Sequence, residues 1–154
     1  TFRAVTLECV APRPVTSIIW MRTEGGPIGV ERSGDRIRIP GYLFSDNTRS
    51  RARLDDQGRL GVAVLPQTSA EIAGLSVPPG TWTVRVEGTG ADGVALYVEN
   101  ARTGDIFASG PNGATFAVGA PADTTDSRPT KVSIRLRTPE GDGAHVHEVL
   151  LIRS

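Results

Sequence analysis

The sequence lacks the features that mark several large classes of protein. It has one cysteine, Cys9, so no disulfide can form within the chain. No apolar run approaches the ~20 residues that a membrane-spanning helix needs, so we expect no direct membrane insertion. Lysine and arginine together number 17, as do aspartate and glutamate, and the formal net charge is zero. That balance argues against a dedicated nucleic-acid-binding protein.

What the chain has in quantity is turn chemistry. The 18 glycines and 11 prolines among 154 residues indicate many turns and leave little room for long helices. This length is typical of one domain, and no linker or fixed-period repeat divides it. We therefore expect a single domain over 1–154. Because the first residue is Thr1 and not methionine, we expect this domain to be a fragment or module of a larger, processed protein.

Short stretches in which apolar and polar residues alternate recur along the whole chain, separated by turn sequences such as EGGP, VPPG and PEGDG. Residues 68–74 also fit a short helix, but they lead directly into a further strand and turn, so we predict a strand there. Residues 119–129 have little to bury and are predicted to be a surface loop. The predicted strands are 3–9, 16–22, 35–39, 49–54, 59–65, 70–77, 81–87, 93–99, 105–109, 114–118, 131–137 and 145–152. Such strands are typical of antiparallel sheets packed face to face, so the sequence predicts an all-β sandwich.

The two tryptophans carry different expectations. Trp82 shares one face of its predicted strand with Val84 and Val86, so we expect it in the core and not on a binding surface. Trp20 lies in SIIWMR, which is apolar on both faces. One of those faces fits the core and the other fits a partner or ligand surface, because a flat aromatic ring can bind the C–H side of a pyranose.

Both tyrosines are candidates for ligand binding. Tyr97 lies on the polar face of its predicted strand, which fits either a sugar-stacking platform or a surface tyrosine that covers a neighbouring strand. Tyr42 lies in the loop-like stretch IPGYLFSDN, and binding residues concentrate on loops.

Arginines gather in one part of the sequence. In RSRARL, Arg49, Arg51 and Arg53 would form a row on one strand face, and guanidinium groups bind carboxylate, sulfate or phosphate bidentately. A solvated face neutralised by nearby carboxylates is the alternative. The arginines of this region are Arg32, Arg36, Arg38, Arg49, Arg51, Arg53 and Arg59.

The second half of the chain has a recognisable order of motifs. LSVPPGTWTVRVEG is followed by the hairpin VALYVENARTGDIFASG, then by TFAV, then by TKVSIRLRTPEGDGAHVHEVLLI. From residue 69 to the end, this order resembles carbohydrate-binding modules of the galactose-binding-like jelly-roll type. The resemblance implies an antiparallel jelly-roll β-sandwich that binds a poly- or oligosaccharide. Related jelly rolls also occur in phage tail and spike proteins, where they serve attachment or assembly.

The same resemblance implies a structural calcium ion where the first and last strands meet, with Glu8 and Glu148 among its ligands. His147 stands where such modules have a further acidic residue, and calcium prefers oxygen ligands. His145 and His147 would project from one face of a regular strand, a spacing that can hold zinc, but no third ligand of similar quality stands out.

No catalytic signature is present: the sequence has no G-x-S-x-G, P-loop, H-E-x-x-H or dinucleotide-binding motif. We therefore expect no enzyme, and the resemblance implies an extracytoplasmic module of a larger glycan-active protein that stacks a sugar on Trp20, Tyr42 or Tyr97. The alternative is a structural or attachment jelly roll of a phage tail, spike or other surface assembly, which would self-associate. A zinc enzyme built on the histidine pair is a third reading.

Overall fold

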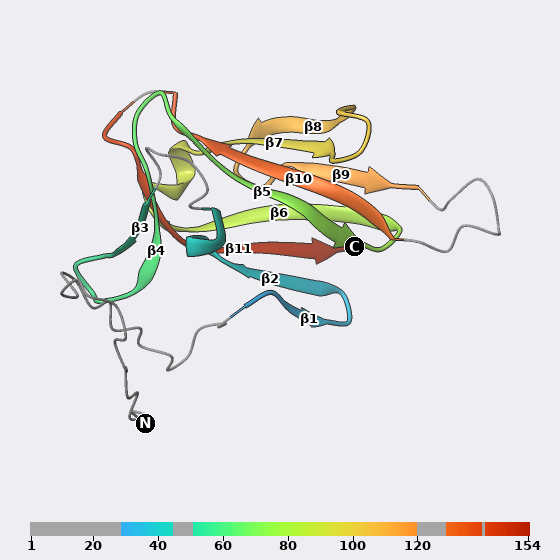
Figure 1. Ribbon diagram of the computed structural model, residues 1–154, viewed down its shortest axis with the longest axis horizontal. Helices are drawn as coiled ribbons and strands as arrows, with labels where there is room; N and C mark the ends of the chain where they lie inside the picture. Colours follow the sequence, from blue (N-terminus) through green and yellow to red (C-terminus); the bar gives the residue numbers. More distant parts are fainter. Residues whose placement is uncertain (1–28, 45–50, 120–128, 140) are drawn as a thin grey trace, which may run out of the picture.

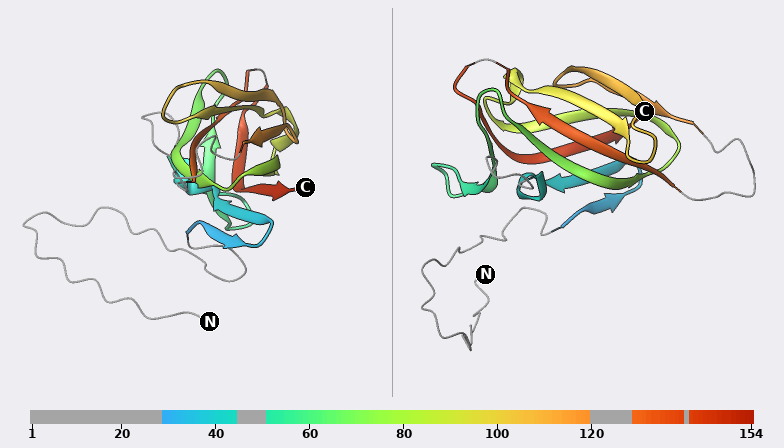
Figure 2. Two further views of the ribbon diagram at one scale, coloured as in Figure 1. Left: turned by 90° about the vertical axis from the view of Figure 1, so that its right-hand side faces the viewer. Right: turned by 45° about the horizontal axis from the view of Figure 1, so that its top comes forward.

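The computed structural model describes residues 29–44, 51–119, 129–139 and 141–154. Two antiparallel sheets face each other, as the view along the long axis in Figure 2 shows. The larger sheet contains β1 (Glu31–Ser33), β2 (Arg36–Pro40), β3 (Arg51–Leu54), β4 (Leu60–Val64), β6 (Gly80–Thr89), β9 (Thr115–Val118) and β11 (Ala144–Arg153). The smaller sheet has the order β5 (Ser69–Val77), β10 (Thr130–Arg137), β7 (Ala95–Asn100) and β8 (Ile106–Pro111). The arrangement is an all-β sandwich, which confirms the predicted fold class (Figure 1).

Every strand predicted from residue 35 onward is present, as β2 to β11, with ends that shift by a few residues. The ambiguous segment before VPPG is the strand β5, as predicted. The predicted strands 3–9 and 16–22 and most of the predicted loop 119–129 lie outside the described residues. β1 was not predicted from the sequence, because all three of its residues are exposed and show no burial pattern.

Two short 3-10 helices, η1 (Gly41–Phe44) and η2 (Ala91–Gly93), are the only helices in the described part of the chain. Neither is long enough to cross a membrane. The chain around η1 was predicted to be loop-like, and instead Phe44 at its end is fully buried in the core. Burial of that ring explains why the segment is ordered against the sandwich.

The core lies between the two sheets and takes side chains from both. Trp82 on β6 is fully buried, which confirms the prediction from its strand parity. Its indole Nε1 donates a hydrogen bond to the Pro78 carbonyl oxygen at 2.9 Å. The guanidinium carbon of Arg153 lies 5.6 Å from the ring centroid. Trp82 is therefore a structural residue whose one polar atom is satisfied within the fold.

β11 is the strand around which the larger sheet is built. One edge of β11 pairs with β6, while the other edge pairs with β4 near its start and with β2 further along. Its pairing with β6 is interrupted by a β-bulge at His147, between Val146 and Glu148. The bulge explains the apolar residues at both parities of this strand, because Val146 before it and Val149 after it are both fully buried.

Gly61 on β4 lets this strand approach β11. A Cβ atom at Gly61 would collide with the Val146 carbonyl oxygen and would lie 2.6 Å from Cε1 of the His145 ring. Val146 belongs to the backbone of the central strand, so it cannot move aside without disturbing the sheet. The absence of a side chain at Gly61 is therefore a condition of the β4–β11 pairing.

We expect Gly61→Ala to lower the free energy of unfolding by roughly 1–3 kcal/mol or more, because it overpacks the sheet against main chain. Gly93→Ala is the matched control, since nothing lies within 4 Å of a Cβ atom there. Urea unfolding followed by tryptophan fluorescence measures both. Equal stability of the two variants would contradict the role given to Gly61.

Candidate ligand-binding site

The outer face of the smaller sheet carries a row of side chains across all four strands. Glu71 on β5 lies opposite Arg135 on β10, Arg135 lies opposite Tyr97 on β7, and Tyr97 lies opposite Ser109 on β8. Residues directly opposite one another on antiparallel strands point to the same face. The neighbours of Tyr97 along β7 are fully buried, so this row faces away from the core.

Arg135 is held in place beside Tyr97 by two carboxylates. Its Nε lies 3.3 Å from Glu71 Oε2, and its Nη2 lies 3.7 Å from Glu99 Oε1. Exposed ion pairs contribute only about 0–1 kcal/mol to stability. These two pairs direct the guanidinium group of Arg135 toward the carboxylates of β5 and β7.

The next row of outward-facing residues along the sheet has shorter side chains beside its arginine. Arg137 on β10 lies between Ser69 on β5 and Ala95 on β7, so short side chains flank it on both sides. Arg137 is exposed and forms no ion pair with any described residue. The two rows together leave a depression between Tyr97 and the start of β5.

The wall of this depression is the turn that joins β4 to β5. Gln67 in this turn has φ 60°, the only positive φ among the described residues other than glycine. A side chain in this left-handed region costs about 1–2 kcal/mol, so the surrounding contacts must hold it there. The backbone N–H of Gln67 donates to the Thr138 carbonyl oxygen at 2.8 Å, and the N–H of Thr68 donates to the Leu65 carbonyl oxygen at 3.1 Å.

Thr138, just after β10, completes this turn. It is 1% exposed, and its hydroxyl oxygen lies 2.9 Å from the Leu65 carbonyl oxygen, to which it donates. Thr138 also forms an isolated bridge with Pro66. The turn is therefore fastened to the end of the strand that carries Arg135 and Arg137.

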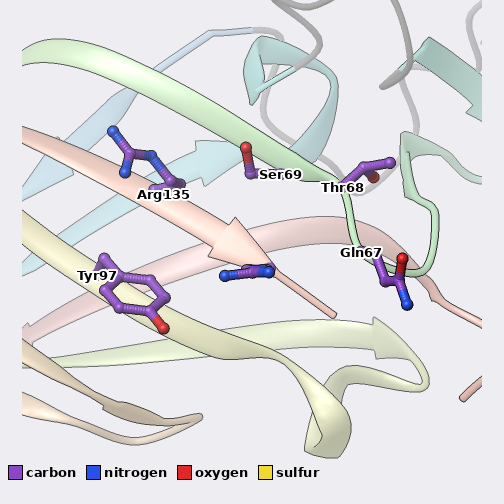
Figure 3. Close-up of a pocket in the computed structure, with 6 residues that line it drawn as sticks. Gln67, Thr68, Ser69, Tyr97 and Arg135 are labelled. Carbon is purple, nitrogen blue, oxygen red and sulfur yellow. The ribbon is translucent and has the colours of Figure 1, made fainter. Parts of the chain in front are cut away.

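These elements enclose a pocket of about 310 Å³. Figure 3 shows Tyr97 and Arg135 on neighbouring strands of its floor and Gln67 at the turn that leads into β5. The pocket combines one aromatic ring with amide, hydroxyl and guanidinium groups. Its lining residues are Gln67, Thr68, Ser69, Tyr97, Arg135 and Arg137.

Of the predicted ligand-binding residues, only Tyr97 lines this pocket. Tyr42 is half-buried in η1, and Arg51 and Arg53 are exposed on β3. Neither Arg51 nor Arg53 forms an ion pair with a described residue, and the Arg53 carbonyl oxygen lies 3.0 Å from Nε2 of His145. Trp20 and Arg49 lie outside the described residues.

The predicted metal ligands do not form a described metal centre. Glu8 lies outside the described residues, and the Glu148 carboxylate accepts a hydrogen bond from Arg38 Nη2 at 2.7 Å. No group of three His, Cys, Asp or Glu side chains among the described residues is placed to hold a metal ion. The calcium ion and the zinc reading therefore stay predictions.

His147, at the bulge, is perturbed by its surroundings. Burial lowers the pKa of its imidazole below the usual value, and the nearby Arg59 charge lowers it further. Both effects favour the neutral imidazole over the charged one.

Sequence reasoning missed five of the six residues that line the pocket. The polar face of β10 was visible in the alternation of KVSIRLR, so Arg135 and Arg137 could be placed on a solvent-exposed surface. What the sequence does not contain is the pairing of β10 with both β5 and β7, which brings these arginines beside Tyr97. Gln67 gave no signal, because a left-handed turn position is normally expected at glycine or asparagine.

Comparisons with solved structures identify the architecture. The C-terminal CBM6 of LamC, a marine laminarinase from Zobellia galactanivorans, is similar with a TM-score of 0.52 and 10% sequence identity, over 77% of this chain and 99% of that one. The fold is that of a jelly-roll carbohydrate-binding module. The resemblance stated from the sequence is confirmed at the level of fold.

Two further structures are similar. One is the carbohydrate-binding module CBM6cm-2 of Cellvibrio mixtus lichenase 5A in complex with cellotriose, with a TM-score of 0.49 and 12% identity over 76% of this chain and 96% of that one. The other is an exo-beta-1,3-galactanase from Phanerochaete chrysosporium with galactose, with a TM-score of 0.46 and 12% identity over 78% of this chain and 30% of that one. No family model and no curated protein matches the sequence.

The strain at Gln67 predicts an unusual response to substitution. Gln67→Gly removes the left-handed penalty of about 1–2 kcal/mol and adds roughly 0.4–1 kcal/mol of chain entropy to the unfolded state. We therefore expect its unfolding midpoint to equal or exceed that of the wild type. Gln57→Gly changes an exposed turn position without positive φ. It only adds chain entropy to the unfolded state, so this variant should be less stable than the wild type. Equal losses in the two variants, measured by thermal unfolding, would show that Gln67 is not strained.

Proposed function

We propose that this chain is a non-catalytic module that binds a glycan in the pocket around Tyr97. The observation that carries the proposal is the composition of the pocket: one aromatic ring lies beside two guanidinium groups and the amide of Gln67. A pyranose presents an apolar C–H face and a rim of hydroxyl groups. An aromatic surface bordered by hydrogen-bonding groups matches both features.

The ring of Tyr97 is accessible to a ligand. The residues directly opposite it are Arg135 and Ser109, and no apolar side chain lies across from it on either neighbouring strand. The Tyr97 hydroxyl makes no hydrogen bond with a described residue. This arrangement favours the sugar-platform interpretation of Tyr97 over that of a tyrosine that covers its neighbours.

The same pocket supports binding without cleavage. Glycoside hydrolysis commonly uses two carboxyl groups on either side of the scissile bond. None of the six lining residues carries a carboxyl group. The nearest carboxylates on this face, Glu71 and Glu99, are both engaged by Arg135.

The fold supports a role as an accessory domain. The module from the laminarinase of Zobellia galactanivorans shares the architecture over almost its whole length and is itself part of a larger enzyme. By analogy, we propose that this chain is appended to a secreted, periplasmic or envelope-associated glycan-active protein. A shallow pocket with few contacts fits micromolar to millimolar affinity, which the parent protein would raise through avidity.

The attachment or assembly function remains the alternative. It requires an apolar surface that copies of the chain bury against each other. Among the exposed large hydrophobic residues of the described part, Leu54 lies on β3 and Ile106 on β8, while Val30 precedes β1 and Leu65 follows β4. Light scattering of the purified domain tests this alternative, which predicts an oligomer independent of concentration.

Glycan-array screening followed by calorimetry tests the proposed function. We expect binding to a defined glycan class, and we expect Tyr97→Ala to weaken it at least about tenfold, because the stacking surface is lost. Tyr42→Ala, which removes the only other tyrosine, should bind as the wild type does. Binding that survives Tyr97→Ala but is lost in Tyr42→Ala would move the site to the η1 edge. Repeating the array with calcium and with EDTA tests the calcium ion predicted from Glu8 and Glu148.

A further inference from the structure

The two arginines of the pocket differ in charge balance. Arg135 contacts two carboxylates, those of Glu71 and Glu99. Arg137 lies two residues further along the same strand face and has Ser69 and Ala95 as its cross-strand neighbours, neither of which is charged. Arg137 forms no ion pair with a described residue. Among the described residues, the pocket therefore holds one guanidinium, that of Arg137, with no carboxylate paired to it.

The other polar groups of the pocket also differ in whether they already have a hydrogen-bond partner. The Gln67 amide lines the pocket and makes no hydrogen bond of its own with a described residue, so it is an available donor. The Thr68 hydroxyl already donates to the Leu65 carbonyl oxygen at 2.7 Å. The donors of Arg137 and Gln67 line the same pocket as the ring of Tyr97, and none of the residues in that lining carries a carboxylate.

We propose that the pocket selects glycans that carry an oxyanion, either the carboxylate of a uronic acid or a sulfate ester. The pyranose ring stacks on Tyr97, and the anionic group accepts hydrogen bonds from Arg137 and Gln67. The guanidinium fork matches the two oxygens of either anion. This inference rests on the proposed function and names the ligand class of the same pocket.

The test is a calorimetric titration of the domain with three oligosaccharides of similar length: a neutral glucan, a uronic-acid oligomer and a sulfated galactan. We expect at least one acidic ligand to bind about tenfold more tightly than the neutral one, because hydrogen bonds to charged groups are the stronger kind. Binding of that ligand should weaken as NaCl is raised from low to high concentration. The two acidic ligands distinguish a carboxylate from a sulfate as the recognised group.

Two arginine variants localise the effect. Arg137→Gln should reduce affinity for the acidic ligand about tenfold and affinity for the neutral glucan by less, because only the acidic ligand offers an oxyanion to the guanidinium fork. Arg102→Gln is the matched control, since it removes the same charge from an exposed turn whose side chain has no partner among the described residues. Arg137→Lys keeps the charge without the fork and should give an intermediate affinity.

The outcomes separate the two levels of the proposal. If the neutral glucan binds as tightly as the acidic ones, in a manner that depends on Tyr97 but not on Arg137, the proposed function stands and the selection of anions is wrong. If Arg102→Gln weakens acidic binding as much as Arg137→Gln does, the effect is one of net charge, and the assignment to the pocket is wrong. If none of the three ligands binds and the glycan array is also blank, both the proposed function and this inference fail.

Discussion

The pocket on the smaller sheet depends on one buried residue, Thr138, whose hydrogen bonds join the two sheets. Its hydroxyl donates to the Leu65 carbonyl oxygen beyond β4, and its own carbonyl oxygen accepts from the N–H of Gln67. β4 belongs to the larger sheet, and Thr138 follows β10 of the smaller one. The turn that joins β4 to β5 is thus held at both Leu65 and Gln67. Since β4 itself is placed by its close approach to β11 at Gly61, the pocket wall is fixed by the packing of the whole sandwich.

This fastening explains how the fold keeps Gln67 in a conformation that side chains avoid. The backbone hydrogen bond from Gln67 to the buried Thr138 helps to offset a local cost of about 1–2 kcal/mol, and the side chain is thereby presented to the pocket. Glycine would relieve the strain but would remove the amide. Strain of this kind collects at ligand sites, where geometry matters more than stability. The orientation of Arg135 by Glu71 and Glu99 follows the same principle, because it fixes a donor before any ligand arrives.

Strand parity made the inner and outer faces predictable from the sequence. Alternation alone assigned Trp82 to the core and Tyr97 to the outer surface, and both assignments agree with the structure. Parity does not reveal which strands lie side by side, so the neighbours of Tyr97 could not be predicted. Tyr42 and η1 were read as a loop because the burial of Phe44 depends on tertiary packing, which no local pattern encodes. The arginine row of Arg49, Arg51 and Arg53 stays a prediction, because Arg51 and Arg53 are exposed on β3 away from this pocket and Arg49 lies outside the described residues.

The central claim is that the outer face of the smaller sheet binds the glycan, and chemical-shift mapping tests it most directly. A glycan identified by the array would be titrated into ¹⁵N-labelled protein while backbone amide resonances are followed. The account predicts shifts concentrated at Gln67, Ala95, Tyr97 and Arg137, with β3 and η1 unchanged. Chemical-shift changes concentrated at β3 and η1, with the amide resonances around Tyr97 unchanged, would contradict it.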